Sequence, residues 1–340
     1  MRFATSKQFA PQLLGAVLVM ALGLGVGWYL WGKPDLRDAE NPNPNSLRLA
    51  GYDFVSPLLV CSTSFNESAP ELSGLKAALS EVVETSIKNG VVSSASVYFK
   101  DLTTGREVSV NGSERFFPAS LKKIPLMMKI YRDAESDPKS LQEKKVLTGS
   151  QDYNVNAAIP PSKVPVYGQK YSHEELIEYM IKYSDNISFQ VMLNDLGNEK
   201  FNKVFTDLQL HYPDTVVSID DYTTPFQFSL FFRTLYNATY LTADNSEKAL
   251  KLLSETEFND GLVAGVPKDV RVAHKFGVGV VSQQDGTDKG ELHDCGITYS
   301  AKNPYLICVM TKSESAIEKV SNVISRISAV AYRAADADYR

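Results

Sequence analysis

The strand and helix patterns of this chain follow an order that few folds can accommodate. Helical spacing over residues 71–88 precedes two strand-like segments, 95–98 and 107–110, which flank a glycine-containing turn and so indicate a hairpin. Helical patterns then cover 120–134, 173–183, 187–196, 199–208, 225–236 and 246–253. Strand patterns return at 270–274, 278–282, 290–299 and 305–311, before a last helix at 316–334. Strands clustered in hairpins, with helices segregated between them, predict an α+β fold: an antiparallel sheet flanked by N- and C-terminal helices, plus an all-helical subdomain.

The N-terminal segment predicts a membrane anchor. No charged residue lies between Lys7 and Lys33, and residues 13–31 are almost wholly apolar. About 20 such residues in a helix span a hydrocarbon core of about 30 Å. Trp28 and Trp31 stand at the far end, where amphipathic rings favour lipid head groups. We therefore expect a short tail at 1–10 and one transmembrane helix at 11–32, with a cleaved signal peptide as the alternative.

A linker and one folded domain follow the predicted anchor. Residues 33–50 contain charges and prolines but no apolar period, which is typical of an extended tether. The remaining patterns run without another such interruption. We expect a single folded domain over residues 51–340.

Charge and cysteine content argue against several classes of protein. The chain has 35 Lys and Arg residues against 40 Asp and Glu residues, a net charge of −5, so no broad cationic surface for nucleic acid is expected. Its four histidines show no metal-ligand spacing, and its three cysteines are too few for a cysteine-based zinc site. We expect neither a metal nor a cofactor. Cys295 and Cys308 fall on neighbouring predicted strands and could pair, but we expect two buried free thiols.

The first candidate for chemistry is an S-x-x-K motif at Ser120 and Lys123. A serine in the first turn of a helix meets unpaired backbone N–H groups and the positive end of the helix dipole, which stabilise an oxyanion. Lys123 lies three residues on, on the same helix face, and can reach the hydroxyl. The motif alone is weak, because Ser73 and Lys76 have the same spacing and Ser120 could be only a helix cap.

Two further motifs are informative because of their order along the chain. Ser184-Asp185-Asn186 stands at the junction of two helical patterns, where either Ser184 or Asp185 could also be a simple helix cap. Lys275-Phe276-Gly277 lies among the late strand patterns. A serine-lysine pair, S-D-N and a late K-x-G, in this order, are the set found in class A β-lactamases and penicillin-binding proteins.

Over residues 52–339 the chain resembles a class A β-lactamase-related serine hydrolase of the serine β-lactamase and penicillin-binding protein superfamily. Thr224-Pro225 resembles the family's entry to the helix that follows its omega loop. The resemblance implies that Ser120 is the acylated nucleophile, Lys123 its base, and Ser184 the donor of a proton to the leaving nitrogen. It also implies four substrate-binding residues: Asn186, Lys275, Gly277 and Val278. Lys275 would attract the substrate carboxylate, and the backbone N–H groups of Ser120 and Val278 would form the oxyanion hole.

Two positions depart from the family pattern. Phe276 stands where the family usually has Thr or Ser, so the hydroxyl that would bind a substrate carboxylate is missing. Residues 211–222 contain Asp214, Asp220 and Asp221 but no glutamate to activate a deacylating water. We therefore expect slow deacylation.

These features predict a membrane-anchored serine hydrolase with its catalytic domain outside the cytoplasm. Its expected substrates are β-lactams or D-alanyl cell-wall peptides, since both present an amide beside a carboxylate to a serine-lysine pair. The alternative, favoured by the two departures, is a binding or scaffolding module that kept the fold and lost turnover.

Overall fold

The computed structural model describes residues 46–61, 72–210, 222–282 and 288–337. Its centre is a five-stranded antiparallel sheet with the strand order β4-β3-β9-β8-β7. The strands are β3 (Ser94–Asp101), β4 (Glu107–Val110), β7 (Val272–Ser282), β8 (Asp288–Thr298) and β9 (Tyr305–Ser313). β7 is an edge strand of this sheet. It contacts the segment that contains the predicted nucleophile, Ser120.

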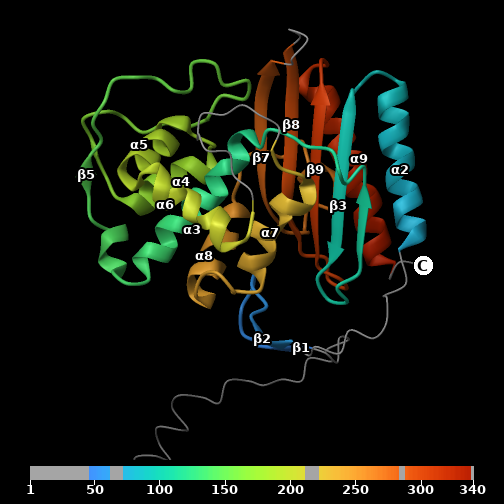
Figure 1. The fold of residues 1–340 in the computed structure, drawn as a ribbon, viewed down its shortest axis with the longest axis horizontal. Helices are drawn as coiled ribbons and strands as arrows, with labels where there is room; N and C mark the ends of the chain where they lie inside the picture. The colour runs from blue at the N-terminus through green and yellow to red at the C-terminus, as the bar shows by residue number, and fades with distance from the viewer. Residues whose placement is uncertain (1–45, 62–71, 211–221, 283–287, 338–340) are drawn as a thin grey trace, which may run out of the picture.

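Two helices from opposite ends of the folded chain cover one face of the sheet. They are α2 (Ser73–Lys88) and α9 (Ile317–Asp336), which pack on each other (Figure 1). Apolar residues at helical spacing, such as Leu79 and Val83 in α2 and Ile324 in α9, are fully buried against Phe99 and other sheet residues. This amphipathic spacing is what makes both segments helical.

The other helices form the second part of the molecule, on the opposite side of the sheet (Figure 1). They are α3 (Lys123–Ala134), α4 (His173–Lys182), α5 (Asn186–Leu196), α6 (Asn198–Asp207), α7 (Pro225–Tyr236) and α8 (Ala243–Leu253). Short 3-10 helices occur at η1 (Ala119–Lys122), η2 (Pro138–Leu141) and η3 (Val263–Gly265). The structure also has two small two-stranded sheets. In one, β1 (Ser46–Arg48) pairs with β2 (Leu58–Cys61), and in the other, β5 (Lys145–Val146) pairs with β6 (Lys170–Tyr171).

Local capping fixes where two of these helices begin. Ser172 and Glu175 form a reciprocal capping box at the start of α4, and Thr224 and Gln227 form another at the start of α7. Pro225 occupies the first turn of α7, where its missing N–H costs nothing. The Thr-Pro pair noted in the sequence is therefore a helix start.

The predicted α+β architecture is confirmed, with differences at two boundaries. The segments expected as separate strands at 270–274 and 278–282 form one strand, β7, which pairs continuously with β8 through Lys275, Phe276 and Gly277. Glycines at 277 and 279 interrupt the apolar pattern without interrupting the backbone pairing. Ser46–Arg48 pair with β2, so ordered structure begins within the predicted linker.

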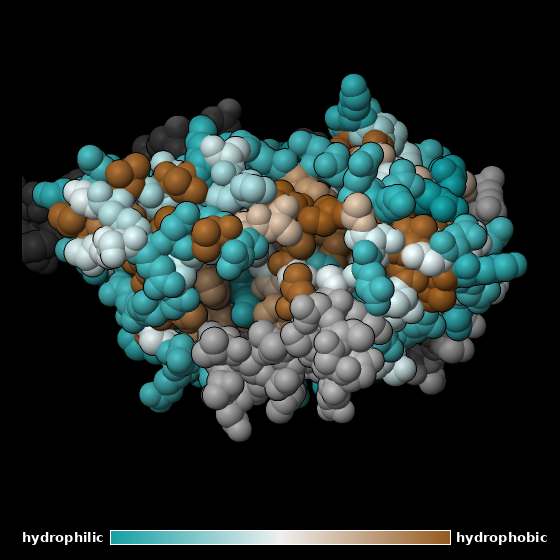
Figure 2. All heavy atoms as spheres, turned by 90° about the horizontal axis from the view of Figure 1, so that it is seen from above, coloured by the Kyte–Doolittle hydropathy of each residue, from teal (hydrophilic) through white to brown (hydrophobic). Residues whose placement is uncertain are grey.

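The predicted anchor at 11–32 lies outside the described residues. Within the described part of the chain, no helix has the length and apolarity needed to cross a membrane. Seen from above, hydrophobic side chains gather in several groups on the described surface, one of them near its middle, with hydrophilic side chains between and around them (Figure 2).

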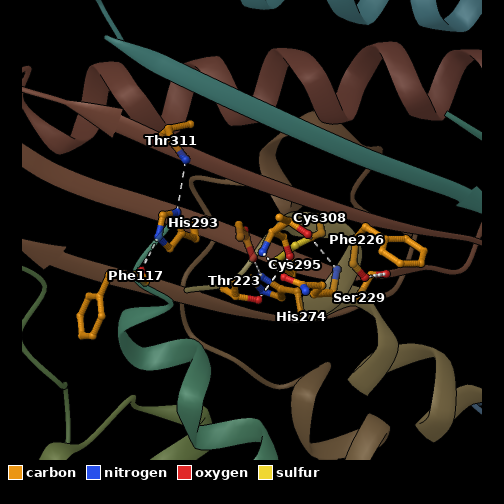
Figure 3. The surroundings of a disulfide bond; sticks show 12 residues. Phe117, Thr223, Phe226, Ser229, His274, His293, Cys295, Cys308 and Thr311 are labelled. Atoms are coloured by element: carbon orange, nitrogen blue, oxygen red, sulfur yellow. Dashed lines mark hydrogen bonds and ion pairs between the residues drawn. A yellow bond between two sulfur atoms is a disulfide. The ribbon is translucent and has the colours of Figure 1, made fainter. Parts of the chain in front are cut away.

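Cys295 and Cys308 form a disulfide, which corrects the expectation of two free thiols. They face each other directly in the register of β8 and β9, with their Cα atoms 3.9 Å apart (Figure 3). The sequence placed both on neighbouring strands but did not give the register. Pairing depends on that register, because only directly opposed residues bring their sulfur atoms together.

Candidate active site

Ser120 lies in the 3-10 turn η1, directly before α3, and its side chain is partly exposed. The preceding residue, Ala119, has a φ of +49°, in the left-handed region that alanine rarely adopts. Such strained backbone is concentrated at functional sites, where the surrounding structure holds it in place. The turn therefore presents the Ser120 hydroxyl at the surface while Ala119 and Leu121 on either side are buried.

Lys123 is the centre of a cluster of hydrogen bonds. Its Nζ lies 3.2 Å from Oγ of Ser120 and donates to the Asn186 side-chain oxygen at 2.7 Å. It also lies 2.5 Å from the backbone oxygen of Ser184 and 3.2 Å from its Oγ. The side chain is only 1% exposed, and burial lowers its pKa to about 7, with a further lowering from Lys122 and an opposing effect of Asp185. The amine is thus neutral in a substantial fraction of molecules at neutral pH.

Ser184 joins α4 to α5 with a φ of +58°. Its left-handed backbone turns both its carbonyl and its hydroxyl toward Lys123. The neighbouring Asp185 caps α5 by accepting from the Ser188 N–H at 2.6 Å, and it also accepts from Asn154 at 2.7 Å. Asp185 is therefore a brace of this turn, in agreement with the cap alternative for that residue.

Asn186 uses both ends of its amide within the protein. Its oxygen accepts from Lys123, its NH₂ donates to the Tyr153 carbonyl at 3.2 Å, and its backbone N–H donates to Asn154 at 2.9 Å. Tyr153 and Asn154 were not singled out in the sequence, because they lie in a loop with no motif or period. Their contribution arises only from folding this loop over the S-D-N turn.

Lys275 lies in the interior end of the cluster, with no exposed surface. Its Nζ donates to Oγ of Ser184 and to the backbone oxygen of Phe276, both at 2.9 Å. Burial lowers its pKa well below the usual range, and the nearby Lys123 lowers it further. Ser184 Oγ therefore lies between the two lysine amines and links them.

Gly277 allows β7 to approach the nucleophile turn. A Cβ at this position would lie 2.9 Å from the Pro118 oxygen, closer than real Cβ contacts, and 3.1 Å from the Leu121 nitrogen, tighter than most of them. The predicted oxyanion hole combines the N–H of Ser120 in η1 with that of Val278 in β7. These two elements are the ones that the glycine brings together.

Two buried residues, Glu291 and His293, hydrogen-bond to the segment that precedes Ser120. His293 accepts from the Thr311 N–H through Nδ1 at 3.2 Å, so its Nε2–H donates to the Phe117 oxygen at 2.9 Å (Figure 3) and to Glu291 at 3.0 Å. Glu291 also accepts from the Phe117 N–H at 3.0 Å. In the sequence, His293 is only one of four histidines without metal-ligand spacing. Its role in holding the segment before Ser120 required the tertiary structure.

Hydrogen bonds join five of the predicted site residues: Ser120, Lys123, Ser184, Asn186 and Lys275. Gly277 lies close to the backbone on both sides of Ser120, and Val278 follows it in β7. The acidic residues of the segment that lacks a glutamate, Asp214, Asp220 and Asp221, lie outside the described residues. Among the residues described, no group of three or more His, Cys, Asp or Glu side chains could hold a metal ion.

Comparison with known proteins places the chain in a family. The model of the Beta-lactamase enzyme family matches residues 75–335. This chain belongs to that family. It is a serine hydrolase that acts on amide bonds.

Solved structures of the family share the fold. PBP-A is 21% identical with a TM-score of 0.63, over 78% of this chain and 98% of that chain. A class A beta-lactamase from Mycobacterium abscessus is 20% identical with a TM-score of 0.63, over 75% and 98%. A representative of class A beta-lactamase from Bacteroides cellulosilyticus is 17% identical with a TM-score of 0.65, over 78% and 99%. At these identities the likeness concerns the fold.

Proposed function

We propose that this protein forms an acyl-enzyme on Ser120 with β-lactams or D-alanyl cell-wall peptides and releases the acyl group slowly. The observation that carries the proposal is the contact of Ser120 Oγ with Lys123 Nζ, at 3.2 Å, together with the lowering of the Lys123 pKa to about 7. A lysine that is neutral at working pH can accept the hydroxyl proton.

In the acylation step, Oγ of Ser120 attacks the amide carbonyl while its proton passes to neutral Lys123. The new C–O bond gives a tetrahedral oxyanion, stabilised by the N–H groups of Ser120 and Val278. The C–N bond then breaks, and the leaving nitrogen takes a proton from Oγ of Ser184. Lys123, now an ammonium 3.2 Å from that oxygen, returns the proton to Ser184.

We place the second half of the reaction, hydrolysis of the acyl-enzyme, at a much lower rate. The sequence offers no glutamate over residues 211–222 to activate a water. Loss of a positioned general base costs about 10² to 10⁴-fold. A stoichiometric burst of β-lactam consumption followed by slow release is the expected time course, and rapid steady-state hydrolysis without an accumulating adduct would contradict it.

We also propose that residues 11–32 anchor the protein in a membrane, with the hydrolase domain outside the cytoplasm. The support is the uncharged apolar stretch between Lys7 and Lys33 and the polar, proline-containing segment that follows it. Fractionation of cells before and after alkaline carbonate extraction, with protease added to intact cells, tests both parts.

Mass spectrometry after incubation with penicillin G and a panel of D-alanyl peptides tests the chemistry. PBP-A provides a precedent for the probe, since a mutant of that protein has been solved as an acyl-enzyme complex with penicillin G. An adduct is expected on Ser120 and not on Ser73, which has the same S-x-x-K spacing but is exposed at the start of α2. The adduct should disappear in Ser120→Ala and persist in the matched control Ser73→Ala. An adduct that persists in Ser120→Ala would contradict the proposal.

A further inference from the structure

Phe276 covers the lysine that was expected to bind a substrate carboxylate. The centroid of its ring lies 3.9 Å from Nζ of Lys275, and that amine already donates to Ser184 and to the Phe276 backbone. Lys275 has no exposed surface. A carboxylate that approached this end of the cleft would meet an aromatic ring instead of an accessible ammonium group.

The Phe276 ring is held in this place by a second aromatic ring. Phe258 stacks on it with the ring centroids 4.5 Å apart and an interplanar angle of 29°. Both rings are buried. The stacked pair therefore forms a fixed wall, because neither ring can rotate away without opening a void in the core.

This wall borders a cavity of about 320 Å³ that is partly open to solvent. Tyr183 and Phe276 line it, and they are the chain neighbours of Ser184 and Lys275, whose polar side-chain atoms lie 2.9 Å apart. The volume is within the range of pockets that hold small organic groups. Apolar side chains supply much of its lining, including Ile159 and Ile317.

The charges around the cavity also oppose an anion. Of the described residues that line it, Glu257, Asp260 and Glu318 carry carboxylates, whereas Lys182 carries the one ammonium group. Lys182 is itself 3.5 Å from Glu255. A carboxylate in this cavity would lie among more like charges than opposite ones, which is unfavourable.

We propose that the substrate presents an uncharged apolar group, and not a carboxylate, to the Lys275 and Phe276 end of the cleft, and that this group occupies the cavity beside Phe258 and Phe276. The inference rests on the proposed acylation of Ser120. Within the proposed substrate classes, this selects the β-lactams and D-alanyl peptides whose neighbouring carboxylate is masked as an ester or amide.

Penicillin G, its methyl ester and its benzyl ester test this inference on the full-length protein in detergent solution. All three carry the same β-lactam ring, the methyl ester removes the charge, and the benzyl ester also adds an apolar group that fits the cavity. The rate of Ser120 adduct formation is measured for each compound by mass spectrometry. It is then divided by the rate at which the β-lactam ring of the same compound is hydrolysed in alkali. We expect the benzyl ester to have the highest relative rate, the methyl ester an intermediate one and the free acid the lowest. The first and the last should differ by at least about tenfold.

Two variants assign the preference to the aromatic wall. Phe276→Thr should reduce the ratio of the benzyl ester rate to the acid rate severalfold, whereas Phe258→Leu should slow the benzyl ester without accelerating the acid. Each ratio is taken on one protein sample, so a loss of folded protein cancels. A faster reaction of the free acid with the wild type, equal rates for the two esters, or an unchanged ratio in both variants would overturn the inference. Failure of all three compounds to acylate Ser120 would instead overturn the proposed function, and this inference with it.

Discussion

Lys123 contacts Ser184 twice, through the carbonyl oxygen at 2.5 Å and through Oγ at 3.2 Å. The two residues are far apart in the sequence, and the positive φ of Ser184 is what turns both oxygens toward the amine. The same amine contacts Ser120. One side chain thus holds the nucleophile turn and the S-D-N turn in a fixed relation.

Replacing Ser184 by Ala or by Gly should separate chemistry from backbone strain. Both variants lose the hydroxyl, so both should acylate about 10² to 10⁴-fold more slowly. Gly accepts a positive φ without the penalty that a Cβ imposes, so Ser184→Gly should have the higher free energy of unfolding, by about 1 kcal/mol. Acylation rates by mass spectrometry and urea unfolding measure the two effects. Equal stability of the variants would show that the φ of +58° carries no strain.

The acylation rate should rise with pH and level off above about pH 7. The folded-state pKa of Lys123 is about 7, and only the neutral amine accepts the Ser120 proton. Lys122 lowers that pKa, so Lys122→Gln should move the midpoint of the profile to higher pH. Single-turnover rates between pH 5 and about 9 check both statements. A profile that is unchanged in Lys123→Met would make another group the base.

Stability should also rise with pH in the alkaline range. Lys123 has a pKa of about 7 when folded and about 10.4 when unfolded, so between these values the unfolded chain binds one more proton. The free energy of unfolding therefore increases by up to about 1.4 kcal/mol per pH unit in this window, and the effect vanishes below pH 7. In Lys123→Met, the increase of the free energy of unfolding per pH unit should be smaller by this amount. Urea unfolding at pH 7, 8 and 9 measures it, and parallel slopes in the two proteins would contradict the low pKa.

Gly277→Ala should impair acylation more than Gly279→Ala. At Gly277 the added Cβ meets backbone atoms of Pro118 and Leu121, which cannot move without separating β7 from η1. At Gly279 the nearest atoms are the Cβ of Ala119 and ring atoms of Phe117, all at 3.3 Å, so a shift of a few tenths of an ångström makes room for the methyl group. A displacement of about 1 Å between the predicted oxyanion donors would cost up to about 10²-fold in rate. Similar acylation rates in the two variants would exclude this role of the glycine.

Removing the disulfide should destabilise the fold. Cys295 and Cys308 are separated by 13 positions, and a bridge closing a loop of this size contributes about 3 kcal/mol. The free energy of unfolding, measured with urea, should fall by that amount in the double variant with Ala at both positions. Reductant should also lower the free energy of unfolding of the wild type. Alkylation of the unfolded, unreduced protein should modify Cys61 alone. Labelling of three thiols would show that the bridge is absent.

The sequence alone determined the fold class, the course of most helices and the residues of the candidate site. Local signals carried this much: helical spacing in 71–88, the Thr-Pro start of α7, and three motifs whose order is specific even though each is weak. Such signals depend on neighbouring residues along the chain, which a sequence displays directly.

Only the tertiary structure decided how the site is assembled and what surrounds it. Pairing of Cys295 with Cys308 depends on strand register, and the support of Ser120 by His293 and Glu291 depends on packing between β8 and η1. The sequence showed that Phe276 lacks a hydroxyl, but its stack on Phe258 comes from two segments that folding brings together, and this stack fixes the ring beside the neighbouring Lys275. Burial sets the pKa of Lys123 for the same reason: desolvation is a property of all the atoms around a group, and most of them are distant in sequence.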